Sequence, residues 1–174
     1  MTEDVKTLAL RHLKRDATHI SASILLHEET VDFLPWGDRY RGICPDIRGF
    51  MGLHCVASTG VAEIAIAMLG MKRWDLNGRD SNGPTPLVWD SKYGGWALAN
   101  VLLEQEDVDP TLSDKHGLAP LAYAAKAGKE GVVKLLLERV EVNPNSSNIS
   151  STTALSHAAR SRHMAVVKIL LDRG

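Results

Sequence analysis

Hydrophobic positions recur at a fixed spacing through most of the chain. From Leu121, steps of 34 residues reach Leu87 and then Leu53 in one direction, and Leu155 in the other. Apolar triplets recur at the same spacing, at residues 67–69, 101–103, 135–137 and 169–171. A repeat of this length is typical of a solenoid, in which each unit buries its apolar faces by stacking on its neighbours.

The unit at residues 117–150 shows the pattern best and predicts two short helices. Pro120 opens the first helix, where a proline costs no hydrogen bond. Gly128 ends it, because glycine accepts the left-handed conformation that a helix stop requires. The apolar run at 132–137 predicts the second helix, which we expect to stop at Asn143-Pro144.

The spacing divides the chain into a repeat array and a segment before it. We expect repeats at 49–82, 83–116 and 117–150, and a partial repeat at 151–174. Residues 1–48 predict two amphipathic helices, as a cap or a divergent repeat, followed by an irregular apolar loop at 30–48. A partner-binding helix is the alternative for this segment, and the role of the loop stays open. The apolar end of the last repeat suggests a longer array, or one extended by a partner.

Several motifs carry a family resemblance. The sequence resembles the ankyrin repeat at Thr85-Pro86-Leu87, in the run 119–125 with Gly128, and in the apolar run 132–137 that follows. The resemblance covers residues 49–174 and implies an all-α solenoid of helix–turn–helix repeats. It also implies β-hairpin fingers, with their tips at residues 80–84, 114–118 and 148–152.

The 34-residue spacing and the segments 107–110 and 141–144 resemble a fungal subgroup of these arrays. In that subgroup the arrays often follow a NACHT-type nucleotide-binding domain in intracellular sensors. No glycine-rich phosphate loop with lysine occurs in this sequence, so such a domain would lie outside it.

Two departures from the family pattern affect stability. Ala119 stands where a threonine would cap a helix start, a loss of about 1 kcal/mol. Arg162 replaces the turn glycine of the fourth repeat, where a positive φ would be strained. We therefore expect the fourth repeat to be the least stable.

Composition narrows the possible functions. A net charge of −1 with 24% charged residues argues against a nucleic-acid binder that works through overall charge. Two cysteines, Cys44 and Cys55, form neither a disulfide framework nor a four-cysteine zinc site and suit a reducing compartment. No signal peptide or membrane span is evident, so we expect an intracellular, cytoplasmic protein without a membrane or nucleic-acid partner.

Catalysis and metal binding have little support in the sequence. The seven histidines show no zinc-site spacing. His54 matches a family position that ties neighbouring turns together. Cys55 follows His54 directly, so the two side chains diverge around a helix instead of meeting. We expect neither an enzyme nor a cofactor or metal, and the hypothesis of a cysteine hydrolase is remote.

The resemblance also implies where a partner would bind. In the ankyrin family, the two positions after the Ala-Ala of each first helix and the finger tips usually contact the partner. The expected protein-binding residues are Ser81, Asn82, Lys92, Tyr93, Lys115, His116, Leu118, Lys126 and Arg160.

Three of these residues, Lys92, Lys126 and Arg160, recur at the repeat spacing, and we call them the basic row. The basic row could steer an acidic peptide. Equally, its cations could merely complement the helix dipoles. We expect Trp89 to offer exposed contact area and Trp96 to pack in the core.

Two functional hypotheses of different classes follow. The first is a protein–protein interaction module without catalysis, in which rigid stacked helices hold the contact residues in place before the partner arrives. The second is a regulatory or spacer array of a larger NACHT-type NTPase.

Overall fold

The computed structural model describes residues 53–54, 57, 62–69, 75–80, 83–93 and 95–173. The two helices and the loop expected within residues 1–48 lie outside these residues. So do Cys44, Cys55, Ser81 and Asn82.

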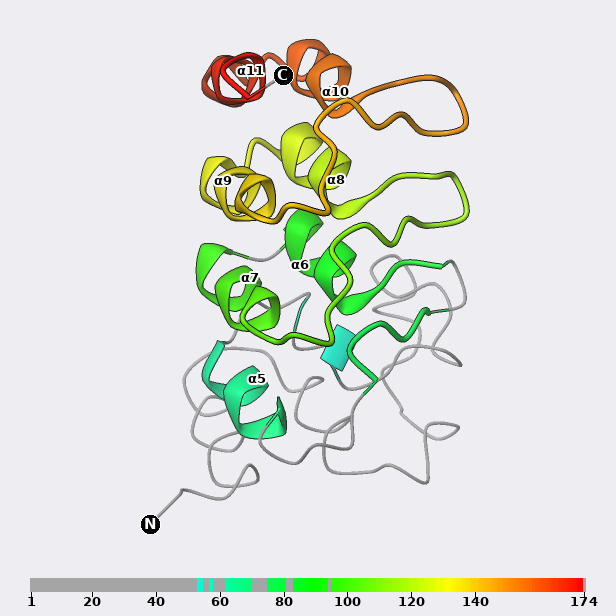
Figure 1. Cartoon of the computed structure of the whole chain (residues 1–174). Helices are drawn as coiled ribbons and strands as arrows, with labels where there is room; N and C mark the ends of the chain where they lie inside the picture. The colour runs from blue at the N-terminus through cyan, green and yellow to red at the C-terminus, as the bar shows by residue number, and fades with distance from the viewer. Residues whose placement is uncertain are drawn as a thin grey trace, which may run out of the picture.

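Within the described residues the regular structure is helical, which confirms the all-α fold class. The helices α6, α8 and α10 stack in one column, and α5, α7, α9 and α11 stack beside them (Figure 1). Loops before α6, α8 and α10 project to one side (Figure 1). The bounds are α5 Ala62–Leu69, α6 Pro86–Tyr93, α7 Trp96–Leu103, α8 Pro120–Ala127, α9 Glu130–Glu138, α10 Ala154–Arg160 and α11 Met164–Leu171.

Local sequence explains the bounds of the central helix pair. Pro120 occupies the first turn of α8, and Gly128 ends the helix with φ at 70°. Ala124 and Ala125 are both 0% exposed. Their small side chains let neighbouring first helices approach closely, and this close packing buries them. The more apolar helix α9 buries Val132, Val133 and Leu136 against its neighbours. A pair this short has no core of its own and depends on stacking.

The equivalent leucines lie at the interior positions that the spacing predicts. Leu53, Leu87 and Leu121 are 1%, 1% and 2% exposed, and Leu155 is partly buried against the same core. The repeat units are therefore structurally equivalent, although their exact boundaries stay predictions.

The three expected finger tips are tight turns. Backbone hydrogen bonds close them from Asp80 to Pro84, from Asp114 to Leu118 and from Asn148 to Thr152, at 3.0, 3.0 and 3.1 Å. The expected β-hairpin fingers are hairpin-like turns in the described residues, where one antiparallel bridge forms, between Ser147 and Thr153, and no extended strand does.

The side chains at the start of the second and third tips explain why no strand ladder forms there. Asp114 Oδ1 accepts hydrogen bonds from the amides of His116 and Leu118, at 2.8 and 2.9 Å. Asn148 Oδ1 binds the amides of Ser150 and Thr152 in the same way. These local side-chain bonds satisfy backbone amides that a hairpin would otherwise pair across the strands.

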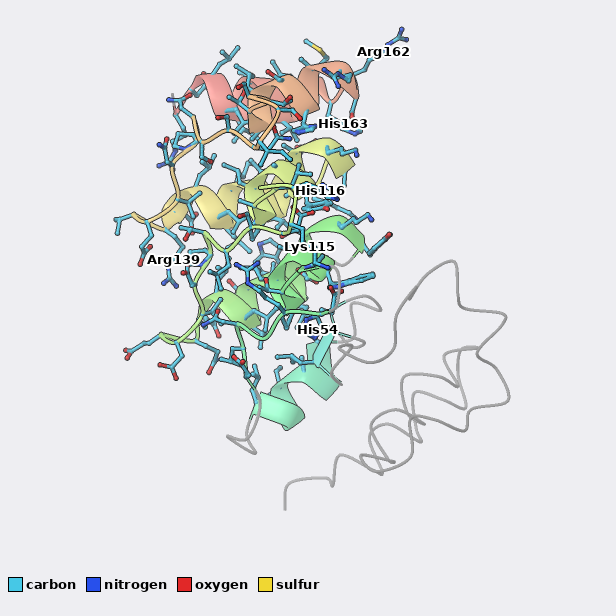
Figure 2. All side chains as sticks on the ribbon, turned by 90° about the vertical axis from the view of Figure 1, so that its right-hand side faces the viewer. His54, Lys115, His116, Arg139, Arg162 and His163 are labelled. Carbon is cyan, nitrogen blue, oxygen red and sulfur yellow. The ribbon has the colours of Figure 1, made fainter. Side chains whose placement is uncertain are left out.

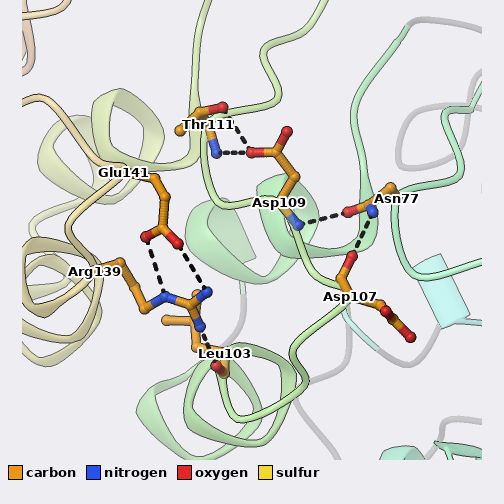
Figure 3. A network of polar contacts seen from close by, with 7 residues as sticks. All are labelled: Asn77, Leu103, Asp107, Asp109, Thr111, Arg139 and Glu141. Atoms are coloured by element: carbon orange, nitrogen blue, oxygen red, sulfur yellow. Dashed lines mark hydrogen bonds and ion pairs between the residues drawn. The ribbon is translucent and has the colours of Figure 1, made fainter.

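Polar contacts join successive repeats (Figure 3). The Asn77 amide donates to the Asp107 carbonyl at 2.7 Å and accepts from the Asp109 amide at 2.9 Å. Arg139 donates to the Leu103 carbonyl at 2.6 Å and lies 3.5 Å from the Glu141 carboxylate.

His54 acts in the same way. It donates from Nε2 to the Pro84 carbonyl at 3.2 Å, which confirms its role as a tie between neighbouring turns.

Two local expectations meet different outcomes. The expected stop at Asn143-Pro144 was wrong, because α9 already ends at Glu138 and Arg139 turns to extended backbone with ψ at 125°. A longer helix would carry Val140, which is 96% exposed, without burying it. The expectation for Arg162 is confirmed, since its φ is 62°, in the left-handed region that disfavours residues with a Cβ.

Candidate binding surface

The basic row lies at equivalent positions of successive helices. Lys92, Lys126 and Arg160 stand in the last turns of α6, α8 and α10, and all three side chains are exposed. Tyr93 follows Lys92 and is 46% exposed.

The second finger contributes the remaining described residues of the predicted set. Lys115 and His116 are exposed at its tip, and Leu118 is partly buried. Figure 2, viewed from the finger side, shows Lys115 and His116 in the same half of the molecule as His163. Arg139 lies in the other half (Figure 2). The described residues of the predicted set thus belong to the fingers and the first helices, which we call the finger–helix surface.

The expectation for Trp89 was wrong, because this residue is buried at 7% exposure. Its indole Nε1 donates to Asp80 Oδ2 at 2.7 Å, so the side chain ties α6 to its finger. One repeat later, the Tyr123 hydroxyl donates to Asp114 Oδ2 at the same distance of 2.7 Å. We call these two contacts the finger clasps. The sequence signal was an aromatic residue nine positions after an aspartate in both repeats.

The expectation for Trp96 was also wrong, because its side chain is 58% exposed. Trp96 begins α7, and its ring lies over Gly131 of the next repeat, where an added Cβ would come 3.0 Å from the indole Cδ1. A glycine in α9 makes room for the ring, so the tryptophan covers a helix instead of entering the core.

An aromatic group at the end of α6 holds one cation in place. The Tyr93 ring stacks on Trp89 with centroids 5.4 Å apart and planes 28° apart. The Lys92 ammonium lies 4.6 Å from the centroid of the Tyr93 ring and 5.7 Å from that of Tyr123. Both distances are within the range of cation–π attraction. Sequence reasoning missed the part played by Tyr123.

Charges separate by sign around this surface. In residues 79–80, 83–93, 112–128 and 146–163, every carboxylate is buried, namely Asp80, Asp90 and Asp114. The exposed cations of the same segments are Arg79, Lys92, Lys115, Lys126, Arg160 and Arg162. The exposed carboxylates of the described residues lie elsewhere, at Asp75, Glu104, Glu106, Asp107, Glu130, Glu138, Glu141 and Asp172. The finger–helix surface is therefore positive, although the chain carries a net charge of −1.

Two histidines that the sequence assigned to structural or surface roles lie within this surface. Burial lowers the pKa of His157, and the charges of Lys126 and Arg160 lower that pKa further. His163 approaches the Lys126 carbonyl through Nε2 at 3.2 Å and so joins the last two repeats.

The surface offers little for a small ligand. A pocket of about 200 Å³ is lined by residues of the second, third and fourth repeats, most of them small or uncharged and polar, and none of the predicted binding residues lines it. In the described part of the chain, no cluster of His, Cys, Asp and Glu could hold a metal ion. None of the helices described there has the length and apolarity to span a bilayer.

Comparison with protein families agrees with this geometry. Residues 90–174 match the family model described as ankyrin repeats, in three copies. The fold is accordingly an all-α ankyrin-repeat solenoid, and the search of curated proteins found no match to the chain. Ankyrin repeats generally mediate protein–protein interactions and are typically non-catalytic.

Proposed function

We propose that the finger–helix surface binds a protein partner that presents an acidic segment. The observation that carries this proposal is the charge distribution, with exposed cations on the fingers and first helices and the three carboxylates of these segments buried. The binding residues would be the nine inferred from the sequence, with Ser81 and Asn82 contributing from the first finger.

The physical argument rests on several modest contributions. A single exposed ion pair contributes only about 0–1 kcal/mol. Several cations on one rigid surface still raise the association rate of an acidic partner and fix its register. Because stacked helices hold these cations before binding, little conformational entropy is lost in the complex.

The proposal predicts that charge reversal in the basic row weakens binding without affecting the fold. The probe is a fluorescein-labelled hexaglutamate peptide, and the measurement is fluorescence anisotropy at low salt. We expect Lys92→Glu with Lys126→Glu to weaken binding by roughly tenfold or more, since two attractions become repulsions. Circular dichroism should show unchanged helicity, because both side chains are exposed.

The matched control places the same charge change on the second helices. Lys134 and Lys168 are exposed on α9 and α11 and are themselves one repeat apart. Lys134→Glu with Lys168→Glu should change the affinity by less than about threefold, because these residues lie outside the finger–helix surface. Equal losses from both double variants would mean that only the overall charge matters, and the proposal would then fail.

The alternative is a regulatory or spacer array within a larger fungal NACHT-type signalling NTPase. It is supported by the 34-residue spacing and by the segments at 107–110 and 141–144. In the parent protein, this hypothesis predicts that Lys92→Glu with Lys126→Glu leaves every interaction intact, whereas deletion of one repeat alters NTPase activity. Both hypotheses include an intracellular location and a longer chain.

A further inference from the structure

The cations of the finger–helix surface are not equivalent in their surroundings. The Lys92 ammonium lies between the ring of Tyr93 in its own repeat and the ring of Tyr123 in the next one, at 4.6 and 5.7 Å from the two centroids. Among the described residues, no aromatic ring lies over Lys126 or Arg160 in this way.

A buried carboxylate holds the Tyr123 ring directly, and another holds the Tyr93 ring through Trp89. Tyr123 donates its hydroxyl proton to Asp114 Oδ2 at 2.7 Å, and burial together with this hydrogen bond raises the pKa of Tyr123. Tyr93 stacks on Trp89, whose indole donates to Asp80 at 2.7 Å. Contacts from two successive fingers therefore converge on one ammonium group.

This arrangement limits the freedom of the lysine side chain before a partner arrives. A free lysine loses most of its rotamer entropy when it forms an ion pair, and that loss offsets much of the gain at an exposed site. The two rings attract the ammonium and already restrict it, while leaving the side chain exposed to a partner. An ion pair formed by Lys92 should therefore have a smaller entropic cost than one formed by Lys126 or Arg160.

We infer that Lys92 is the principal anchor of the finger–helix surface and that it receives a carboxylate of the acidic partner between Tyr93 and Tyr123. The inference rests on the proposed function and adds a ranking within it. Lys126 and Arg160 then contribute steering and register, and Lys92 contributes most of the affinity.

Single charge removals test the ranking with the hexaglutamate probe. Methionine keeps most of the apolar length of these side chains and removes the charge. We expect Lys92→Met to weaken binding about tenfold, and Lys126→Met or Arg160→Met about twofold each. Equal losses from the three variants would overturn the inference but leave the proposed function standing.

A double-mutant cycle tests whether the rings are the cause. Tyr123→Leu removes the ring, so Lys92→Met should cost less in that background than in the natural chain. Tyr123→Phe is the matched control, because it breaks the bond to Asp114 and keeps the ring. In the phenylalanine background, the effect of Lys92→Met should persist. Additive losses in the leucine background would overturn the inference.

A measurement without any ligand separates the two proposals. In NMR spectra of the free chain, the rings should shift the ε-protons of Lys92 upfield of those of Lys126. Absence of this shift would overturn the inference, whatever the binding data show. A retained shift together with no hexaglutamate binding would reject the proposed function, and the anchor role of Lys92 with it.

Discussion

Asp90 places an ionisable carboxyl group at a fully buried position. It lies in the middle of α6 and is 0% exposed, at a position that Ala124 and Ala158 occupy in the next two repeats. Neither carboxylate oxygen has a hydrogen bond of ordinary geometry to a described residue. Burial raises the pKa of Asp90 to about 7, and the Gly95 amide and the charge of Lys129 oppose this shift only in part.

The raised pKa predicts that Asp90→Ala stabilises the chain in a pH-dependent way. The unfolded chain ionises this group near its ordinary pKa of 3.8, whereas the folded chain resists ionisation until about pH 7. The natural chain should therefore lose stability as the pH rises from about 4 to 7. By pH 8 the variant should be more stable by several kcal/mol, on the order of 3, and the advantage should shrink toward pH 4.

Urea denaturation at pH 5 and pH 8 measures this difference. Asp107→Ala is the control, because Asp107 is exposed, and this variant should follow the natural chain at both pH values. Burial lowers the pKa of His54, an effect that acts in the opposite direction at acidic pH. That effect cancels when the two chains are compared. An equal stability advantage at both pH values would show that Asp90 keeps an ordinary pKa.

Arg162 and Asp90 show how much of a single residue's environment can be predicted from the sequence. The positive φ of Arg162 could be predicted, because glycine stands at the equivalent Gly128 and the backbone of each repeat is alike. The burial of Asp90 could in principle be predicted from its alanine equivalents. Its incomplete hydrogen bonding could not, because that depends on where the amides between α6 and α7 point.

The finger clasps explain how each loop is fixed to its first helix. Asp80 binds Trp89 and Asp114 binds Tyr123, each at 2.7 Å and each from the loop to the helix that follows it. The fourth repeat has Asn148 and His157 at these positions. The shorter His157 ring leaves its Nε2 buried and without a hydrogen bond to any described residue.

Restoring the clasp should stabilise the fourth repeat. We expect Asn148→Asp with His157→Tyr to raise the free energy of unfolding by about 1–2 kcal/mol, the contribution of a hydrogen bond to a charged group. Each single substitution should contribute little, because it supplies only one of the two partners. The reverse change, Tyr123→Phe, should lower stability by a similar amount.

Urea denaturation of the four chains in this cycle gives the coupling between the two positions. Strictly additive single effects would show that no clasp forms in the fourth repeat.

Elements could be predicted from the sequence more fully than their contacts. The first helices, the finger tips and the stacking followed from the 34-residue spacing, because repetition averages over local exceptions. For Trp89 and Trp96 the expected exposure was the reverse of that in the structure, and each case has a physical reason. A hydrogen bond to Asp80 draws Trp89 inward, and Gly131 lets Trp96 lie on the surface of α9. Neither contact is visible within one repeat.

At the scale of the whole molecule, burial declines from the second repeat to the fourth. Leu103, Leu137 and Leu171 are equivalent residues, and they are 7% exposed, partly buried and 62% exposed in that order. In a solenoid each repeat contacts only its neighbours, so stability is approximately a sum of repeat and interface contributions. The helices α10 and α11 should therefore open more readily than α8 and α9.

Arg162 tests this picture, because it adds backbone strain to the repeat that is already least covered. Arg162→Gly should relieve about 1 kcal/mol of strain and slow amide exchange in α10 and α11 about fivefold. Exchange in α6 and α7 should stay the same, since only neighbouring repeats are coupled. Arg162→Ala is the matched control, because it removes the guanidinium and keeps the strained Cβ. Hydrogen exchange measured by mass spectrometry resolves these segments. Slower exchange across all helices would instead indicate that the array opens as one cooperative unit.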